Sequence, residues 1–288
     1  MPMKIGMLTG IWYIAEGASL IESLRRASAL GFRYVDLHGV FHGGPAHLQG
    51  DERLAVKKEI EALGLIPRNY VLHPPHNLTT ANEAELEQCF EYLAEGIDLA
   101  LFWGINQLML NAGQWSLNVA RRFAWERAVR FLQRVCDYAA QRDLFIAIES
   151  EPYVWYLVND LDSTQRMIAD VDRPNFTVLI DLGHLALERA HPDELAKIAD
   201  RIVHAHFSEH KPYQHTNQVP GTGFVPFVDY LNTLRQIEID RRVQRFGYDD
   251  LVISFELGVP GDQIDDPDDW VRRSMQYMLR LAPYLGIM

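Results

Sequence analysis

Four short, mostly apolar runs in the second half of the chain each end in a side chain that can bind a metal ion. These side chains are Glu149, Asp181, His206 and Glu256. Three carboxylates and one imidazole form a hard, oxygen-rich donor set, which suits Mn²⁺, Mg²⁺ or Co²⁺ better than a soft metal. A charge at the end of a buried run is costly unless it is paired or bound to a metal, so the repeated pattern needs an explanation.

These runs belong to a regular alternation of strand-like and helix-like segments. Strands are expected over 4–8, 33–38, 66–73, 105–110, 144–149, 176–181, 201–206 and 251–256. Apolar residues at helical spacing predict helices over 19–32, 52–64, 82–103, 117–142, 163–171, 192–200, 226–243 and 268–283. Eight such units without a linker predict a parallel sheet closed into one (β/α)₈ TIM barrel, a single domain over 1–288. An open doubly wound sheet is the alternative, but no G-x-G-x-x-G turn follows the first strand.

In a barrel of this kind the functional residues lie at the carboxyl ends of the strands and in the loops that follow. The four metal-competent side chains end consecutive strands and are therefore expected together at one end. Further polar or aromatic side chains are expected at that end, namely His184, His73, Asn111, Trp155 and Lys211. Taken singly, any of these residues could instead be a solvated or structural side chain.

The fifth strand offers two candidate ligands. Glu151 shares a strand face with Glu149 and precedes Pro152, whereas Glu149 directly ends the apolar run. We favour Glu149 and keep Glu151 as its rival. His204 shares a face with His206 but lies one layer deeper, so we expect a structural role for it.

An ordered set of short motifs resembles the xylose isomerase-like barrel superfamily. The motifs are VDLH at 35–38, IAIE at 146–149, DLGH at 181–184, HAH at 204–206, VPGTG at 219–223 and SFE at 254–256. Members of this superfamily include ketose 3-epimerases, hydroxypyruvate isomerase, inosose dehydratase and endonuclease IV-type repair enzymes. The resemblance covers almost the whole chain and implies a homo-oligomer, either a dimer or a tetramer.

The resemblance to the ketose 3-epimerases implies specific roles. Glu149, Asp181, His206 and Glu256 would hold the metal, the two glutamates would also transfer protons on opposite faces of the sugar, and His184 would contact a substrate oxygen. The chain departs from the epimerase pattern at three positions. Trp155 stands where the epimerases carry a Glu, Pro212 stands where they carry an Arg, with Lys211 beside it, and Asp36 replaces a Glu typical of the superfamily.

The composition limits the classes of molecule that the chain is expected to bind. The 288 residues include 27 Lys and Arg against 39 Asp and Glu, a formal net charge of −12. Such a charge repels phosphate backbones and anionic lipids, so neither nucleic acid nor a membrane surface is an expected partner. Cys89 and Cys136 lie in helix-like segments and form no disulfide framework. With no signal-like or membrane-spanning segment in the sequence, we expect a cytoplasmic protein.

The chemistry that these residues imply is proton transfer next to a carbonyl group. A divalent cation on two substrate oxygens stabilises the enediolate, and a positioned carboxylate takes or returns the proton. We therefore expect a metal-dependent isomerase or epimerase of a small sugar or related polyhydroxy carbonyl compound. Mn²⁺ is the expected metal, with Mg²⁺, Co²⁺ and Zn²⁺ as alternatives.

Three other functions stay open. A dehydratase of inosose or dehydroshikimate type would begin with the same proton abstraction and then expel water, with His184 or Lys211 as general acid. An endonuclease IV-like enzyme would need more metal-binding histidines and a basic groove, which the net charge disfavours. A metal-free binding protein would tolerate replacement of all four strand-end residues.

Overall fold

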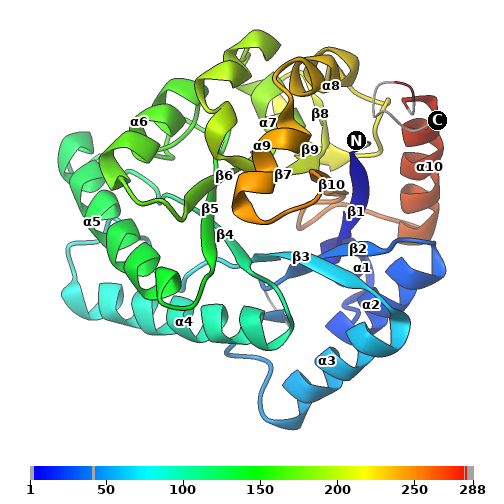
Figure 1. The fold of residues 1–288 in the computed structure, drawn as a ribbon, viewed down its shortest axis with the longest axis horizontal. Helices are drawn as coiled ribbons and strands as arrows, with labels where there is room; N and C mark the ends of the chain where they lie inside the picture. Colours follow the sequence, from blue (N-terminus) through cyan, green and yellow to red (C-terminus); the bar gives the residue numbers. More distant parts are fainter. Residues whose placement is uncertain (1–2, 41–42, 282, 284–288) are drawn as a thin grey trace.

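A computed structural model describes residues 3–40, 43–281 and 283. Eight parallel strands close into a barrel in the order β1-β10-β7-β6-β5-β4-β3-β2 (Figure 1). The barrel strands are β1 (Lys4–Leu8), β2 (Tyr34–His38), β3 (Ile66–Val71), β4 (Gln107–Asn111), β5 (Phe145–Glu149), β6 (Phe176–Asp181), β7 (Ile202–Phe207) and β10 (Val252–Phe255). The predicted single (β/α)₈ TIM barrel is therefore confirmed.

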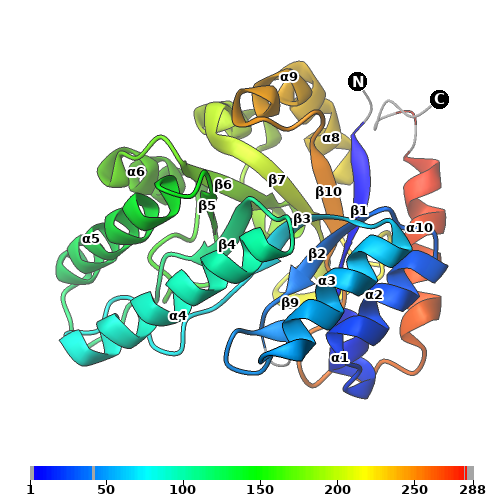
Figure 2. The same ribbon diagram turned by 60° about the horizontal axis from the view of Figure 1, so that its bottom comes forward.

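Helices follow the strands and surround the barrel (Figures 1 and 2). They are α1 (Gly10–Glu16), α2 (Leu20–Ala29), α3 (Asp51–Leu63), α4 (Glu83–Phe102), α5 (Arg121–Ala140), α6 (Leu161–Val171), α7 (Leu182–Leu187), α8 (Phe227–Gln236), α9 (Ile239–Val243) and α10 (Pro267–Arg280). Short 3₁₀ helices are η2 (Pro192–Lys197), η3 (Ala199–Arg201) and η4 (Gln244–Phe246). None of the helices in the described ranges is both long and apolar enough to cross a membrane.

Local signals explain where several helices begin and end. The Ser19 hydroxyl accepts a hydrogen bond from the Glu22 backbone while the Glu22 side chain binds back to Ser19, so a capping box starts α2. Asp160 caps α6 in the same way with Ser163. Gly64 ends α3 in a left-handed conformation, at φ 63°, that costs glycine little.

Several segments differ from the sequence-based expectation, among them the short helices α1 and α7, which lie outside every predicted helix. The region after β7 is not a plain loop, because β8 (Glu209–Lys211) and β9 (Gln214–Gln218) form an antiparallel hairpin. The helix predicted over 226–243 is divided into α8 and α9. Glu238, which lies between them, has φ 53° and interrupts the helical backbone. The helix predicted over 192–200 is a pair of 3₁₀ turns. The hairpin strands are short and polar, so the sequence has no apolar alternation there that would predict them.

The core lies in two layers. Between the barrel and its helices, Phe207 stacks on Phe227 with ring centroids 3.9 Å apart, and Phe255 meets the edges of Phe32 and Phe207. Inside the barrel, some of the buried side chains are polar and pair with one another, as Gln107 does with Asn69 across 3.2 Å.

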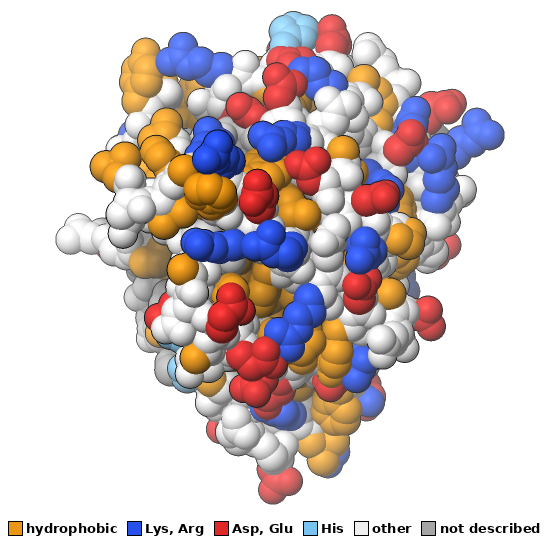
Figure 3. Space-filling model, turned by 90° about the vertical axis from the view of Figure 1, so that its left-hand side faces the viewer, with side chains coloured by type: hydrophobic (Ala, Val, Ile, Leu, Met, Phe, Trp, Pro, Cys, Tyr) orange, Lys and Arg blue, Asp and Glu red, His pale blue; other side chains and the backbone are white. Residues whose placement is uncertain are grey.

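The two ends of the barrel are distinct. Figure 2 shows α9, which leads into β10, at the end opposite α1, which follows β1. The end near α1 is where the strands finish and where β9 lies. On the outer face over α5 and α6, acidic and basic side chains are interspersed (Figure 3), as in the Arg134–Glu87 and Arg173–Asp137 ion pairs.

Replacing Phe255 by Ala should destabilise the fold strongly. The side chain is fully buried between two other phenylalanines, so its loss leaves a cavity and should lower the free energy of unfolding by about 3–5 kcal/mol in urea titrations. The matched control is Leu279→Ala, because Leu279 is 73% exposed and its loss should cost less than about 0.5 kcal/mol. Equal losses in both variants would contradict this packing.

Candidate active site

Four predicted side chains meet at the carboxyl end of the barrel. Glu149 ends β5, Asp181 ends β6, His206 lies in β7 and Glu256 directly follows β10. One ligand atom from each lies within 4.8 Å of those from the others. These four strands are consecutive neighbours in the barrel, so Glu149 and Glu256 stand on the two flanks of the group. Glu149 belongs to the group and its rival Glu151 does not.

Each member of this group carries a buried polar atom that makes no hydrogen bond outside the group in the described structure. These atoms are Glu149 Oε1, Asp181 Oδ2, His206 Nδ1 and Glu256 Oε2. His206 Nδ1 is one nitrogen shared by two carboxylates, and Asp181 Oδ2 has no hydrogen bond, so the group has hydrogen-bonding capacity left that a ligand can satisfy. Carboxylate and imidazole donors that converge within this distance fit a divalent cation.

Asp36 orients His206 from beneath. Its Oδ2 lies 2.7 Å from His204 Nε2 and 3.4 Å from His206 Nε2, and all three side chains are buried. This arrangement turns His206 Nδ1 toward the carboxylates, 2.8 Å from Glu256 Oε2 and 3.4 Å from Glu149 Oε1. Carboxylate partners of this kind commonly fix the orientation of metal-binding histidines.

Asp181 is held by two hydrogen bonds to one of its oxygens. Oδ1 accepts from the backbone N–H of His184 at 2.8 Å and from Ser208 Oγ at 2.5 Å, which leaves Oδ2 for another partner. Gly183 allows this contact, because a Cβ there would overlap Ser208 and the His210 ring. The glycine of the DLGH motif is therefore a packing requirement of the site.

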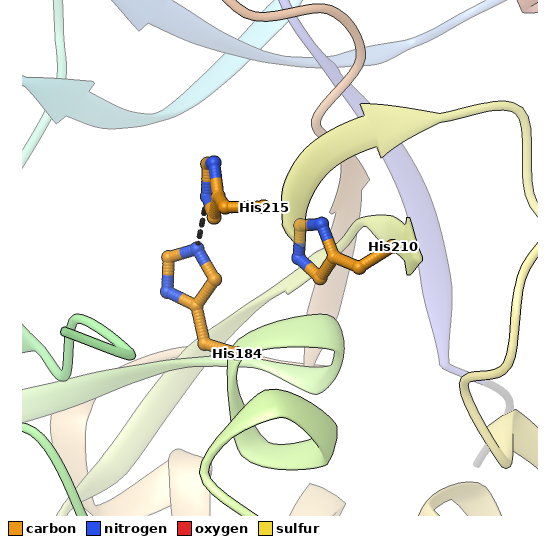
Figure 4. A group of neighbouring side chains, drawn as sticks. All are labelled: His184, His210 and His215. Carbon is orange, nitrogen blue, oxygen red and sulfur yellow. Dashed lines mark hydrogen bonds between the residues drawn. The ribbon is translucent and has the colours of Figure 1, made fainter. Parts of the chain in front are cut away.

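Three imidazoles lie together beside this group. Figure 4 shows His184 on α7 and His210 and His215 on the β8–β9 hairpin, with a 2.8 Å contact between the Nε2 atoms of His184 and His215. His184 Nδ1 donates to the Ser150 carbonyl at 2.9 Å. His210 Nδ1 accepts from the backbone N–H groups of residues 216 and 217, so its Nε2 carries the proton and donates to Ser208. His210 therefore supports Asp181 through Ser208.

The surroundings move the pKa values of the site residues in opposite directions. Burial raises the pKa of Glu149. Burial also opposes the charge of Glu256, but contact with His206 outweighs it and holds the pKa of Glu256 below its usual range. Burial opposes the charge of His206, but hydrogen bonds to Asp36, Glu149 and Glu256 outweigh it and hold the pKa of His206 well above the ordinary value. Burial lowers the pKa of His38 to about 4, so this imidazole is neutral near pH 7.

A cavity of about 260 Å³ opens next to the four side chains. Its polar lining comes largely from the β5–β10 side and includes Glu149, Glu151, His184, His206, Asn217 and Glu256. The β1–β4 side is more apolar, with Ile11, Ile14, Val71 and Met109 beside His38 and His73. A cavity with one polar and one apolar side suits a small molecule with hydroxyl groups on a carbon skeleton.

The predicted substrate-binding residues divide into two sets. His184 and His73 line the cavity, whereas Asn111, Trp155 and Lys211 are not among its lining residues. The Asn111 side chain accepts from the backbone of Gly113, Trp155 is stacked on Tyr153 in an outer loop, and Lys211 is exposed at the end of β8. Their roles stay predictions.

Sequence reasoning missed the contributions of the hairpin. Asn217 Nδ2 donates to Glu256 Oε1 at 2.9 Å, and His215 lines the cavity. Asn217 has φ 40°, a left-handed conformation in which Asn is enriched and which clusters at functional sites. The hairpin itself was not predicted, so neither residue could be placed at the site.

The protein is a TIM barrel, and side chains that can bind a metal ion lie at the carboxyl ends of its strands. The chain belongs to the xylose isomerase-like TIM barrel family, whose model matches residues 24–281. This finding confirms the resemblance that the motifs carry.

The chain is also similar to curated proteins and shares its fold with solved structures. A fructoselysine 3-epimerase of Shigella flexneri is 21% identical over 290 residues, with 96% of this chain and 99% of that protein covered. A 3-dehydroshikimate dehydratase of Bacillus anthracis is 26% identical over 125 residues, which cover 43% of this chain and 44% of that protein. The structure of a D-allulose 3-epimerase from Methylomonas sp. has a TM-score of 0.78 at 19% identity, with 97% and 98% of the chains covered.

Replacing Asp36 by Asn should weaken metal binding although Asp36 is not one of the four candidate ligands. Without the carboxylate beside Nε2, the orientation of His206 is no longer fixed, so calorimetric titration of metal-stripped protein with Mn²⁺ should show about 10- to 100-fold lower affinity. Asp98→Asn, which changes a surface carboxylate paired with Arg142, is the control and should bind Mn²⁺ as the unmodified protein does. Unchanged affinity in Asp36→Asn would contradict the orienting role.

Glu188, at the end of α7, should make stability depend on pH. Burial raises the pKa of this carboxyl to about 7, so its contribution to stability is present below about pH 4.5 and is lost as the pH rises through 7. In metal-free protein, Glu188→Gln should gain on the order of 1–3 kcal/mol relative to the unmodified chain between about pH 5 and about pH 8.5. Urea unfolding at both pH values measures this difference, and parallel pH profiles would argue against it.

Proposed function

We propose that this chain is a divalent-metal-dependent epimerase or isomerase of a small sugar or related polyhydroxy carbonyl compound. The observation that carries the proposal is the convergence of four buried donor atoms from consecutive barrel strands, none of which makes a hydrogen bond outside the group in the described structure. The family membership and the 3-epimerase names of full-length relatives support the same reaction class.

Glu149, Asp181, His206 and Glu256 would hold the metal, and Mn²⁺ suits their donor atoms best. The bound cation would supply the positive charge that stabilises the anion formed when a proton leaves the carbon next to a carbonyl. Glu149 and Glu256 stand on opposite flanks of the group, so one can accept that proton and the other can return one from the other face. Proton return on the opposite face gives epimerisation.

Other residues of the cavity would bind and orient the sugar. His184 is held by Ser150 and presents its other nitrogen toward His215 and the cavity, where it can contact a substrate oxygen. The apolar residues on the β1–β4 side would cover the carbon skeleton and exclude water. We also propose that the chain acts as a single domain, as a homo-oligomer and in the cytoplasm.

Replacing either glutamate by Gln should abolish most of the activity. Protein loaded with Mn²⁺ and incubated with D-fructose, D-tagatose or D-allulose in D₂O should exchange one carbon-bound hydrogen and form an epimer, which NMR detects. Glu149→Gln and Glu256→Gln should each lower kcat by about 10²–10⁴-fold, because each removes a proton-transfer group. Glu188→Gln, a buried carboxyl that is not among the lining residues of the cavity, is the control and should retain activity.

The same experiment tests a second candidate reaction. The partial match to a 3-dehydroshikimate dehydratase favours loss of water after the same proton abstraction. Products lighter by one water, with no epimer, would support the dehydratase. An active Glu149→Gln, Glu256→Gln double variant would exclude both reactions at this site.

A further inference from the structure

A row of aromatic side chains leads from the candidate active-site cavity to the protein surface. His215 lines the cavity, and its ring centroid lies 5.8 Å from that of Tyr153, which belongs to the loop after β5. Tyr153 in turn stacks on Trp155, with ring centroids 4.6 Å apart and an angle of 15° between the rings. Trp155 is 46% exposed, so the row ends in an indole ring that is partly open to solvent. We call Tyr153 and Trp155 the aromatic ledge.

Backbone hydrogen bonds hold the aromatic ledge in place. Trp115 N donates to the Trp155 carbonyl at 2.6 Å, and Tyr156 N donates to the Tyr153 carbonyl at 3.0 Å. An antiparallel bridge pairs Gln114 with Tyr156, so the loop after β5 is tied to the loop after β4. Tyr and Trp side chains on a fixed backbone lose little conformational entropy when a ligand binds them. The ledge is therefore a preformed surface for a flat ring.

The ledge continues the cavity and is not a separate surface. The loop that carries it also lines the cavity, with Glu151 four residues before Trp155. On the other side, the β8–β9 hairpin lines the cavity with His215, and the same imidazole contacts the ring of Tyr153. A molecule that fills the cavity and extends past His215 would therefore meet the ledge.

Neutral polar side chains border the ledge. Gln114, which is bridged to Tyr156, and Gln214, which directly precedes His215, are both exposed, as is Ser116 in the loop after β4. A pyranose ring has C–H groups on its faces and hydroxyl groups around its edge. Its faces match an aromatic side chain, and its hydroxyl groups match amides and hydroxyls that both donate and accept hydrogen bonds. This combination favours a sugar ring over a purely apolar partner.

We propose that the aromatic ledge binds a second sugar ring, so that the preferred substrate is a glycosyl ketose with its ketose unit in the cavity. This inference rests on the proposed function and deepens it, since it names the substrate class of the same site. The C–H face of the attached ring packs on Trp155, and its hydroxyl groups meet the neighbouring amides. A free monosaccharide leaves the ledge unused and binds more weakly.

The test compares D-fructose with three of its glucosyl derivatives. Calorimetry on Mn²⁺-loaded protein would measure the Kd values of D-fructose, maltulose, leucrose and isomaltulose, in which glucose is attached to O4, O5 or O6 of the fructose unit. We expect at least one disaccharide to bind about three- to tenfold tighter than D-fructose, because part of an aromatic ring face becomes buried. If no disaccharide binds tighter than D-fructose, the inference is wrong.

Variants of Trp155 locate the effect. Trp155→Ala should bring the affinity for the preferred disaccharide down to that for D-fructose and leave the D-fructose affinity within about twofold. Trp155→Phe keeps a flat ring and should retain most of the gain. The matched control is Phe102→Ala, which removes a 40% exposed aromatic side chain at the end of α4 and should change neither affinity. A disaccharide preference that survives in Trp155→Ala would contradict the role of the ledge.

Sedimentation separates the ledge from a contact between copies of the chain. Trp155→Ala should sediment as the unmodified protein does. A changed sedimentation coefficient with unchanged sugar affinities would make the ledge a subunit contact and overturn the inference. Tight binding of a disaccharide without hydrogen exchange or epimer formation would contradict the proposed function but not the second sugar site. Epimerisation of D-fructose without any preference for a disaccharide would contradict the second sugar site but not the proposed function.

Discussion

Mutual repulsion among the carboxylates at the end of the barrel is the constraint on which the rest of the site depends. Glu149, Asp181 and Glu256 place oxygens within 4.8 Å of one another, where two negative charges repel by about 3–4 kcal/mol at an effective dielectric constant of about 20. His206 is the only cationic partner within the group. The barrel holds the strand ends together against this repulsion, and a bound cation would turn the repulsion into attraction.

Two supporting layers keep the four side chains in place. Below them, Asp36 contacts His206 from the barrel interior, and beside them Ser208 and His210 hold Asp181. The β8–β9 hairpin contributes Asn217, which donates to one oxygen of Glu256 and leaves the other beside His206. Each of these contacts engages one side of a candidate ligand and leaves another donor atom without a hydrogen bond outside the group.

The pattern of residues predicted the barrel and the meeting of the four strand ends, because parallel strands bring their carboxyl ends to one edge wherever the loops run. It could not show that the Asn111 side chain, at the end of β4, binds the backbone of Gly113, nor place Trp155 in its loop or Lys211 in a short hairpin strand, because neither segment has a periodic signal. The β8–β9 hairpin was not predicted either, because its strands are short and polar and show no apolar alternation. The part played by Asp36 was also hidden, because it depends on contact with residues 168 or more positions away in the chain.

The two halves of the barrel contribute unequally to the candidate metal site. All four candidate ligands come from β5 and the strands after it, yet the carboxylate that orients His206 comes from β2. A chain folded only in its second half would contain all four candidate ligands. It would lack Asp36, the carboxylate that orients His206. The complete metal site therefore requires the closed barrel, and an ion that binds it would stabilise the whole folded chain rather than its second half alone.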